Sequence, residues 1–400
     1  MLRKNRLFTP GPTQMLPSAQ MAMAAAGMHH RTAEFRALFS KTIADLKEFI
    51  GTQNDVLILA ASGTGAMEGT VTNLTSAGDA VLVLTAGKFG ERWTNLAKTF
   101  GCVVDVVSAP YGSTFDLAQV RVALKKNPKC VYLQANETST GARHDVQAIA
   151  ALVKEANAAG GDTLLVVDAI TGLGTTHFDV DGWGVDVIIG GSQKALMIPP
   201  GLAFLAVSER AWKRMDSTTT PRFYFDFRKE RKSQAKGETA YTPATALVAG
   251  MSNALDFIRE MGKGDLRAGS KALVDSAELC AAMTRAAATA LGLKLFSAAN
   301  PGAAATAIMA PEGVDSGAMV KEFRESFGMV VANGQGDEMK GKLFRVAHLG
   351  YYDYLDTIAM AAALEHVVAR VTQQPLAAGV AVKAAQEVYA SAMQKTAGAA

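Results

Sequence analysis

Seven short runs of apolar residues follow one another between about residue 55 and residue 207, separated by longer segments with helical spacing. The runs are dense in Val, Ile and Leu, and they are Val56–Ala60, Ala80–Leu84, Val103–Val107, Cys130–Gln134, Leu164–Asp168, Val185–Gly190 and Leu202–Val207. Strands that alternate with helix-length connections are typical of βαβ units, in which helices cover both faces of a parallel sheet. The pattern predicts an α/β fold with a mainly parallel seven-stranded sheet.

The pattern changes after about residue 245, where long helical segments and isolated strands replace the alternation. Apolar spacing predicts helices over Ala246–Met261, Ala268–Ala290 and Asp353–Val371, and strands over Ala304–Ala310 and Phe344–Ala347. We therefore expect an N-terminal segment (1–15) that crosses to the functional site, a large domain (16–245) and a smaller C-terminal α+β domain (246–375). The alanine-rich tail (376–400) is expected to be a surface helix or partly disordered.

Composition narrows the class of protein. Of the 400 residues, 49% are hydrophobic and 19% are charged, as in folded globular proteins, and the formal net charge of +3 gives no reason to expect nucleic acid or an anionic membrane as a partner. The apolar runs are too short to span a membrane, and the N-terminus lacks the apolar stretch of a signal peptide. Three separated cysteines predict neither disulfides nor a metal site. We expect a cytoplasmic protein whose partners are small molecules.

The segment from Arg222 to Lys232 alternates aromatic and basic residues. Such a pattern occurs in nucleic-acid-binding surfaces and also in mobile, solvated loops that line an entrance or a subunit contact. The nearly balanced charge of the whole chain favours the loop.

Lys194 lies between two predicted core strands, after the strand that ends at Gly190 and before the turn at Pro199-Pro200-Gly201. An amine in a partly desolvated cleft loses its proton more readily, and the neutral amine is the nucleophile that condenses with an aldehyde. Asp168 ends another predicted strand, so the two side chains can face one cleft. A solvated loop lysine and a helix-capping aspartate are the alternatives.

Three more features have possible chemical roles. The glycine-rich turn Ala61–Glu68 follows a strand and opens a helix, which suits an anion, although such turns also serve as plain connections. Phe89 is placed to stack on a flat ring or to pack in the core. Arg345 lies in an apolar strand, where a guanidinium suits bidentate binding of a carboxylate.

In this order along the chain, these residues resemble the class V aminotransferases of fold type I, specifically the alanine/glyoxylate, serine/glyoxylate and serine/pyruvate group. The most specific motif is Gly191-Ser192-Gln193-Lys194-Ala195-Leu196 followed by Pro199-Pro200-Gly201, and the likeness runs from Leu7–Thr13 to Lys340–Gly350. The resemblance implies pyridoxal 5'-phosphate as cofactor and a homodimer with shared active sites.

The resemblance also implies a role for each matching residue. Lys194 is the catalytic lysine that binds the cofactor as an imine, and Asp168 is the partner of its pyridine nitrogen. The other implied cofactor-binding residues are Thr64, Gly65 and Ala66 in the phosphate turn, Phe89 over the ring, Thr138 near the ring hydroxyl, Ile170 behind the ring, Gln193 beside the phosphate, and Tyr241 and Thr242 from the other subunit. Gly11 is expected near the substrate, and Arg345 is expected to bind its α-carboxylate.

The implied reaction is the transfer of an amino group from alanine or serine to glyoxylate or pyruvate. One alternative is another class V enzyme, such as a phosphoserine or aspartate aminotransferase, for which Arg31 and Arg228 are candidate extra cations, or a lyase or cysteine desulfurase. A non-catalytic dimeric scaffold is the other. Some relatives of this branch are labelled hydrogenase subunits, but three scattered cysteines do not suit metal clusters.

Overall fold

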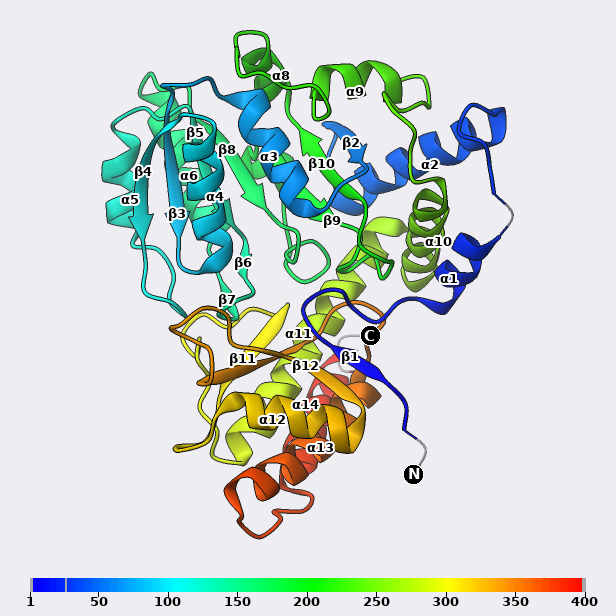
Figure 1. Cartoon of the computed structure of the whole chain (residues 1–400), viewed down its shortest axis with the longest axis vertical. Helices are drawn as coiled ribbons and strands as arrows, with labels where there is room; N and C mark the ends of the chain where they lie inside the picture. Colours follow the sequence, from blue (N-terminus) through cyan, green and yellow to red (C-terminus); the bar gives the residue numbers. More distant parts are fainter. Residues whose placement is uncertain (1–2, 26, 398–400) are drawn as a thin grey trace.

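All seven predicted strands form one sheet in the computed structural model, which describes residues 3–25 and 27–397 (Figure 1). Across the sheet the strands are β2 (Asp55–Leu59), β10 (Ala203–Val207), β9 (Val187–Gly191), β8 (Leu164–Asp168), β5 (Cys130–Gln134), β3 (Ala80–Thr85) and β4 (Val103–Ser108). Only β10 runs antiparallel to its neighbours. The prediction of a mainly parallel seven-stranded sheet is confirmed.

The direction of the strands decides where functional side chains meet. β2, β9, β8, β5 and β3 all point the same way, so their carboxyl ends lie along one edge of the sheet. At this edge Asp168 pairs in register with Gln134 on one side and with Ile189 on the other. Ligands of open α/β sheets bind at such an edge.

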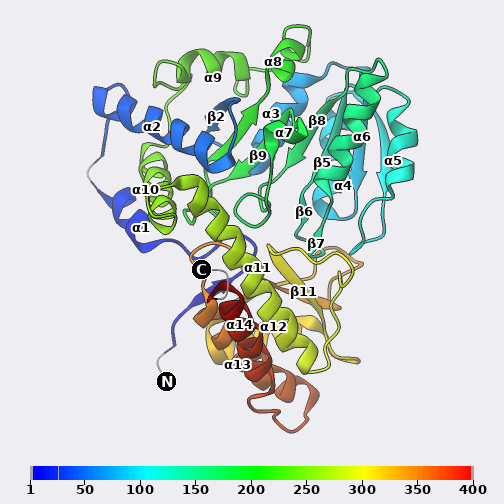
Figure 2. The same cartoon turned by 180° about the vertical axis from the view of Figure 1, so that it is seen from behind.

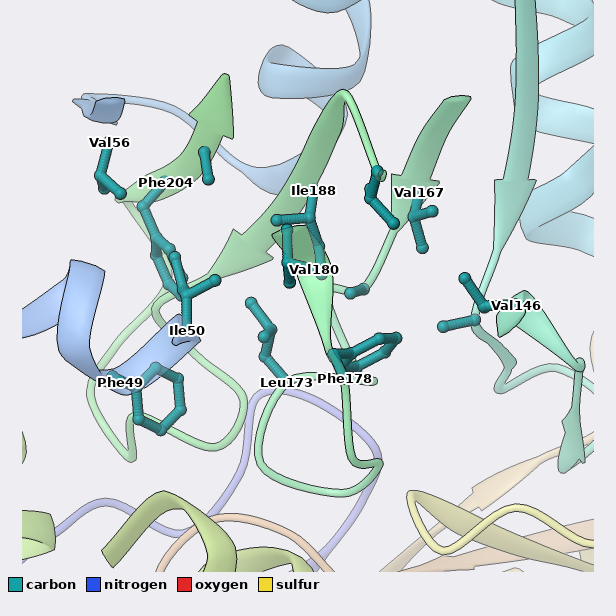
Figure 3. Close-up of a cluster of buried hydrophobic side chains, with 14 of the residues drawn as sticks. Phe49, Ile50, Val56, Val146, Val167, Leu173, Phe178, Val180, Ile188 and Phe204 are labelled. Carbon is teal, nitrogen blue, oxygen red and sulfur yellow. The ribbon is translucent and has the colours of Figure 1, made fainter. Parts of the chain in front are cut away.

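Helices cover both faces of this sheet. Every residue of its central strands β5, β8 and β9 is therefore buried. One face packs against helices α2 (Ala33–Ile50), α5 (Leu117–Leu124), α6 (Val146–Ala158), α7 (Val180–Trp183) and α10 (Thr245–Met261). Figure 3 shows part of this core, where Val167 and Ile188 from the sheet lie near Val180 and Phe178. The other face packs against α3 (Gly63–Leu74), α4 (Lys88–Thr99), α8 (Glu209–Met215) and α9 (Phe227–Gln234).

A second lobe lies below the first in Figure 1 and contains a four-stranded sheet. Its strands, in spatial order, are β1 (Arg6–Phe8), β12 (Met329–Asn333), β13 (Leu343–Ala347) and β11 (Ala305–Met309). Its helices are α12 (Ser316–Phe327), α13 (Tyr354–Thr372) and α14 (Val380–Ala397), and α11 (Leu266–Ala290) runs into it from the upper lobe, as Figure 2 shows from behind. The predicted strands and helices after residue 245 are found within two residues of their expected bounds.

The chain joins the two lobes at several places. β1 pairs in parallel with β12 of the lower sheet, and the chain then continues to α1 (Pro17–Ala24), which packs on α10. The short hairpin of β6 (Asn136–Glu137) and β7 (Ala142–Arg143) extends from the end of β5 toward the lower lobe. Residues from both lobes can therefore reach the edge of the large sheet.

Two expectations need correction. The segment Arg222–Lys232 is not a loop throughout, because α9 begins at Phe227, whose side chain is fully buried, and Asp226 caps the helix by accepting from the N–H groups of Arg228 and Lys229. The alanine-rich tail is not merely a surface segment either. Its helix α14 packs against α11 and α13 and buries Ala381 and Ala385, since small side chains allow close helix contact. Residues 398–400 lie outside the described part.

No helix within the described residues is both long and apolar enough to cross a membrane.

Candidate active site

Lys194 lies in the turn that follows β9, at the carboxyl edge of the large sheet. Its side chain is 9% exposed, and its Nζ donates a hydrogen bond to the carbonyl of Pro10. The hydroxyl of Thr13 donates to the Lys194 carbonyl at 3.1 Å. Gly11 approaches so closely that a Cβ atom there would overlap the lysine side chain, and its φ of +137° also favours glycine. The N-terminal segment thus covers the lysine.

The environment of Lys194 lowers the pKa of its amine. Burial lowers its pKa from 10.5 to about 8; Asp168 opposes this change, while the positive charges of Arg345 and Arg92 add to it. A lysine with a pKa near 8 has a sizeable neutral fraction at physiological pH, and the neutral form is the nucleophile. The alternative of a solvated loop lysine does not fit this burial.

Asp168 is the last residue of β8 and is 6% exposed. Burial raises its pKa from 3.8 to about 6, and the Ile170 N–H, which donates to it at 2.9 Å, opposes the shift together with Lys194 and Arg92. The carboxylate therefore stays ionised at neutral pH. It is suited to hold a cationic group at the sheet edge, such as a protonated ring nitrogen.

The glycine-rich turn lies at the N-terminus of α3 and meets Ile170. A Cβ on Gly63 would overlap the Ile170 side chain, and one on Gly65 would lie 2.9 Å from Phe225. Thr64 Oγ accepts a hydrogen bond from Arg92 Nη1 at 2.9 Å, whereas Ala66 is fully buried. The Gly65 N–H donates to the Ser62 carbonyl at 2.9 Å. The close backbone approach and the positive end of the helix dipole at this N-terminus suit a phosphate group.

Gln193 and Ile170 line the carboxyl end of β9 next to Lys194. A Cβ on Gly191 would lie 3.1 Å from Gln193 Oε1 and 3.2 Å from Ile170 Cγ2, so both side chains line the strand end. The Gln193 Oε1 atom is buried and has no hydrogen-bond partner among the described residues. A buried polar atom without a partner is costly, so a bound polar group is expected to satisfy it.

Phe89 lies in the first turn of α4 and is only partly buried. The guanidinium of Arg92, one turn further along α4, stacks over its ring with 5.0 Å between the guanidinium carbon and the ring centroid. The backbone N–H of Phe89 donates to Glu137 Oε2 at 3.0 Å. The ring is therefore held at the sheet edge rather than within the core.

Arg345 lies in the middle of β13, in the lower lobe, and its side chain reaches the carboxyl edge of the large sheet. The residue is 3% exposed, and its guanidinium donates to the Thr138 carbonyl and to the Asn333 carbonyl, both at 2.8 Å. Its Nε atom is buried without a partner, and no carboxylate forms an ion pair with it among the described residues. Burial lowers its pKa to about 10, opposed by the charge of Glu137. An unpaired buried guanidinium is a ready binding group for a carboxylate.

Tyr241 and Thr242 do not join this cluster within the same chain. They lie between α9 and α10, where Tyr241 donates to the Phe223 carbonyl at 2.7 Å and stacks on Tyr224, with 4.9 Å between ring centroids. Thr242 lines a hollow with Tyr224 and Leu59. Their predicted role in the other subunit stays a prediction.

Arg92 and Glu137 belong to this edge but were not predicted. Arg92 is one helical turn from Phe89, so helical spacing was the signal that pointed to it. Glu137 precedes Thr138, yet nothing in the sequence shows that it is buried and bonded to α4. His348 is buried beside this edge: burial lowers its pKa to about 3, and its Nδ1 lies 3.2 Å from the Ala303 carbonyl.

These residues fit the expected cofactor. The glycine turn at the N-terminus of α3 suits a phosphate, the unpartnered Gln193 oxygen suits a hydrogen-bond donor, Asp168 suits a protonated ring nitrogen, and Lys194 suits an aldehyde. Arg345 remains free for a substrate carboxylate.

The cysteines do not favour a desulfurase. Cys102, Cys130 and Cys280 are all buried, and burial raises the pKa of Cys130 to about 12 and that of Cys280 to about 11. A buried thiol with a raised pKa is a poor nucleophile. Among residues 3–25 and 27–397, no three His, Cys, Asp or Glu side chains are grouped so as to hold a metal ion.

Comparison with known proteins agrees with this arrangement. The family model described as aminotransferase class-V matches residues 14–331. The chain is 38% identical to a soluble hydrogenase small subunit from Synechococcus sp., covering 97% of this chain and 99% of that protein. It is 32% identical to a serine–glyoxylate aminotransferase from Methylorubrum extorquens, with 90% of each covered.

A solved structure of an aspartate aminotransferase of subgroup IV from Thermus thermophilus matches with a TM-score of 0.83 and 35% identity, covering 92% of this chain and 100% of that one. With this fold, this cluster at the sheet edge and these matches, the chain belongs to the class V aminotransferases, fold type I enzymes that use pyridoxal 5'-phosphate.

Proposed function

We propose that this aminotransferase moves the amino group of a small L-amino acid, alanine or serine, to a small 2-oxo acid, glyoxylate or pyruvate, with Lys194 as the catalytic lysine. The observation that carries the proposal is the buried Lys194, with its lowered pKa, lying at one edge with an ionised Asp168 and an unpaired Arg345. The similarity to a serine–glyoxylate aminotransferase supports the substrate class.

In this proposal each part of the cofactor is bound by different residues of the chain. Asp168 holds the ring nitrogen, the turn of Thr64, Gly65 and Ala66 binds the phosphate, and Phe89 stacks on the ring. Thr138, Ile170 and Gln193 complete the lining. When bound, pyridoxal 5'-phosphate supplies an electron sink conjugated to the substrate's Cα.

Lys194 then acts as the base and acid of the reaction. With the cofactor bound, the amine of Lys194 would take a proton from the substrate's Cα, hold it as an ammonium group and give it back as an acid. Because its pKa is lowered to about 8, a part of the amine is neutral at pH 7 and can accept a proton. Asp168 stays charged and unprotonated throughout.

The substrate is oriented by its carboxylate. Arg345 holds it from the lower lobe, with its guanidinium kept in place by the carbonyls of Thr138 and Asn333. Gly11 and Pro10 press on Lys194 from the N-terminal segment and leave little room beside the amine. This crowding supports a small donor.

The test is a panel of donors and acceptors. L-serine, L-alanine and L-aspartate are each paired with glyoxylate, pyruvate and 2-oxoglutarate, and kcat/KM is measured from the amount of new amino acid formed. The proposal requires serine or alanine with glyoxylate or pyruvate to be the best pair. A preference for a dicarboxylic donor by 10-fold or more contradicts it.

A second candidate donor is aspartate, because Arg92 is an additional cation at the site. It forms no ion pair among the described residues, and its charge lowers the pKa of both Lys194 and Asp168. The similarity to an aspartate aminotransferase points the same way. By contrast, Arg31 is exposed and Arg228 lies near Asp216 and Asp226, so neither supports a dicarboxylate.

We also propose a cytoplasmic homodimer with shared sites. Tyr241 bonds to Phe223 and stacks on Tyr224, and this separate environment supports a role across a subunit boundary. Three buried free cysteines are typical of a reducing compartment. Mixing and refolding the inactive variants Lys194→Ala and Thr242→Ala should restore part of the activity if the sites are shared. No recovery, with a dimer present by light scattering, argues for self-contained sites.

A further inference from the structure

Glu137 is a fully buried carboxylate that has no part in the proposed chemistry. It ends β6 and is 0% exposed. Its Oε2 atom accepts from the backbone N–H groups of Phe89 at 3.0 Å and Gly90 at 3.1 Å. Its Oε1 atom accepts from the Ser139 N–H at 3.2 Å and from the Ser139 hydroxyl. Four donors therefore converge on one side chain.

Two of these donors belong to the first turn of α4. The first N–H groups of a helix have no partner within the helix, and here the N-cap residue Gly87 has no side chain to supply one. Glu137 supplies the acceptor instead, from a segment 47 to 48 positions away in the sequence. A Cβ on Gly87 would overlap the Glu137 side chain, so the helix start is packed directly against it. The carboxylate thus fixes the turn that carries Phe89.

Glu137 is also connected to Arg345. The residue after it, Thr138, gives its carbonyl to Arg345 Nη1 at 2.8 Å. Among the charges that act on the Arg345 guanidinium, that of Glu137 is the one that offsets its burial and raises its pKa. One buried residue is therefore linked to the stacking ring in the upper lobe and to the carboxylate-binding arginine of the lower lobe.

We propose that Glu137 is a positioning residue. Its hydrogen bonds to the N–H groups of Phe89 and Gly90 hold the turn that carries the ring, and its charge and its place next to Thr138 help to hold Arg345. The inference rests on the proposed roles of Phe89 and Arg345. It requires a carboxylate, because both oxygens accept and neither needs to donate. The amide of a glutamine offers one oxygen only, so at least one pair of donors would face an NH₂ group.

The test compares Glu137→Gln with Glu91→Gln, a matched change on the same helix. Glu91 bonds to Lys88 and Tyr111 and touches none of the proposed site residues. The first readout is amide hydrogen exchange of the cofactor-free protein over the first turn of α4. We expect exchange at Phe89 and Gly90 to speed up about 10-fold or more in Glu137→Gln, the size expected when hydrogen bonds to a charged group are lost, and to be unchanged in Glu91→Gln.

The second readout is function. Glu137→Gln should raise the Kd for pyridoxal 5'-phosphate by about 10-fold, and it should raise the KM for the amino donor more than it lowers kcat, because a misplaced Arg345 weakens substrate binding. Faster exchange with unchanged Kd and KM means that Glu137 only stabilises the local fold, and it overturns the proposal. Unchanged exchange overturns it as well.

A double-mutant cycle tests the connection to Phe89 directly. If Glu137 acts through the ring, Phe89→Ala with Glu137→Gln should bind the cofactor no more than about 2-fold more weakly than Phe89→Ala alone. If instead the losses of cofactor affinity in the two single variants multiply in the double variant, Glu137 does not act through the ring.

If Glu137→Gln fails to fold, Ser139→Ala removes one of the four donors and should still raise the Kd for the cofactor by about 2-fold to 5-fold. An unchanged Kd contradicts the proposal. Failure of the proposed function is seen separately, as a wild-type protein that binds cofactor but transaminates neither serine nor alanine.

Discussion

Asp168 and Asp186 are two buried aspartates on neighbouring strands of one sheet, and they differ in their partners. Asp186, just before β9, is 2% exposed and accepts from the Leu165 N–H at 2.9 Å, the Ser208 hydroxyl at 2.7 Å and Arg210 Nη1 at 3.2 Å. Asp168, at the carboxyl end of β8, accepts one hydrogen bond within the described residues, from Ile170. Burial raises the pKa of both. Burial alone therefore does not mark a functional carboxylate.

The same contrast separates two arginines. Arg259 donates to Asp45 at 2.7 Å and to Glu48 at 2.9 Å, and these ion pairs join α10 to α2. Arg345 is more deeply buried, yet it finds only carbonyls and keeps an unpartnered Nε. A satisfied buried charge stabilises a fold, whereas one left unsatisfied at a sheet edge is available to a ligand. The comparison therefore assigns a binding role to Arg345 at the sheet edge and a stabilising role to Arg259 between α10 and α2.

The largest expected effect is the loss of turnover in Lys194→Ala. Removing the amine removes both the covalent attachment and the proton transfer, so kcat should fall by about 10⁴-fold or more. The midpoint of thermal unfolding should not fall by more than a few degrees, because burial of an amine with a lowered pKa is unfavourable at neutral pH. Lys126→Ala, which removes an exposed ion pair with Asp105, serves as the control and should keep full activity.

Replacing each aspartate by asparagine tests whether Asp168 serves catalysis and Asp186 serves stability. Asp168→Asn should lower kcat/KM by about 10²-fold to 10³-fold and leave stability nearly unchanged, because a neutral amide cannot hold the protonated ring nitrogen. Asp186→Asn should lower the free energy of unfolding by about 2 to 3 kcal/mol, because several hydrogen bonds to a charge are weakened. The folded fraction should remain active. The measurements are kcat/KM and the free energy of unfolding in urea for both variants. Equal effects on these two quantities in both variants would contradict the different roles of Asp168 and Asp186.

Replacing each arginine by glutamine sharpens the second contrast. Arg345→Gln should raise the KM for the amino donor by about 10-fold to 100-fold, the value of a charged hydrogen-bonded pair, while cofactor affinity changes little. Arg259→Gln should leave KM unchanged and lower the unfolding midpoint. Saturation curves with L-serine and thermal scans distinguish the two. A KM that responds to Arg259 instead of Arg345 argues against the proposed carboxylate site.

The smallest effect is a pH dependence of stability. The folded-state pKa of Lys194 is about 8, below its ordinary 10.5, so between these values the unfolded chain binds more protons than the native one. Stability of the cofactor-free protein should therefore rise between about pH 8 and pH 10.5, by at most about 3.4 kcal/mol at 1.36 kcal/mol per pKa unit. This rise in the free energy of unfolding should be absent in Lys194→Ala. Urea unfolding at several pH values measures it, and parallel curves for the two proteins would contradict the low pKa.

Much of the fold was predictable because its signals are local. Each strand of the large sheet is a dense apolar run, and a strand end is visible wherever such a run meets Asp168 or the turn before Lys194. Helix α9 was not predicted, because a run of charged residues hides the single buried side chain of Phe227. The packing of α14 was missed because alanines give little amphipathic contrast.

The site was predictable where it rests on a motif and not where it rests on tertiary contact. Lys194 and Asp168 follow from strand ends, and Arg345 from a charge in an apolar strand. Glu137 has a role only because the hairpin of β6 and β7 brings it to the start of α4, and no spacing along the chain reports that contact. Arg92 likewise gains its place from the face of α4 that meets Thr64.

The visible absorption spectrum of the purified protein with pyridoxal 5'-phosphate, during addition of L-serine or L-alanine and then glyoxylate, tests the central claim most directly. We predict a yellow band that bleaches with the amino acid and returns with glyoxylate, and that the covalent band is absent in Lys194→Ala. A wild-type protein that stays colourless with added cofactor, or a Lys194→Ala variant that cycles as wild type does, would contradict the account.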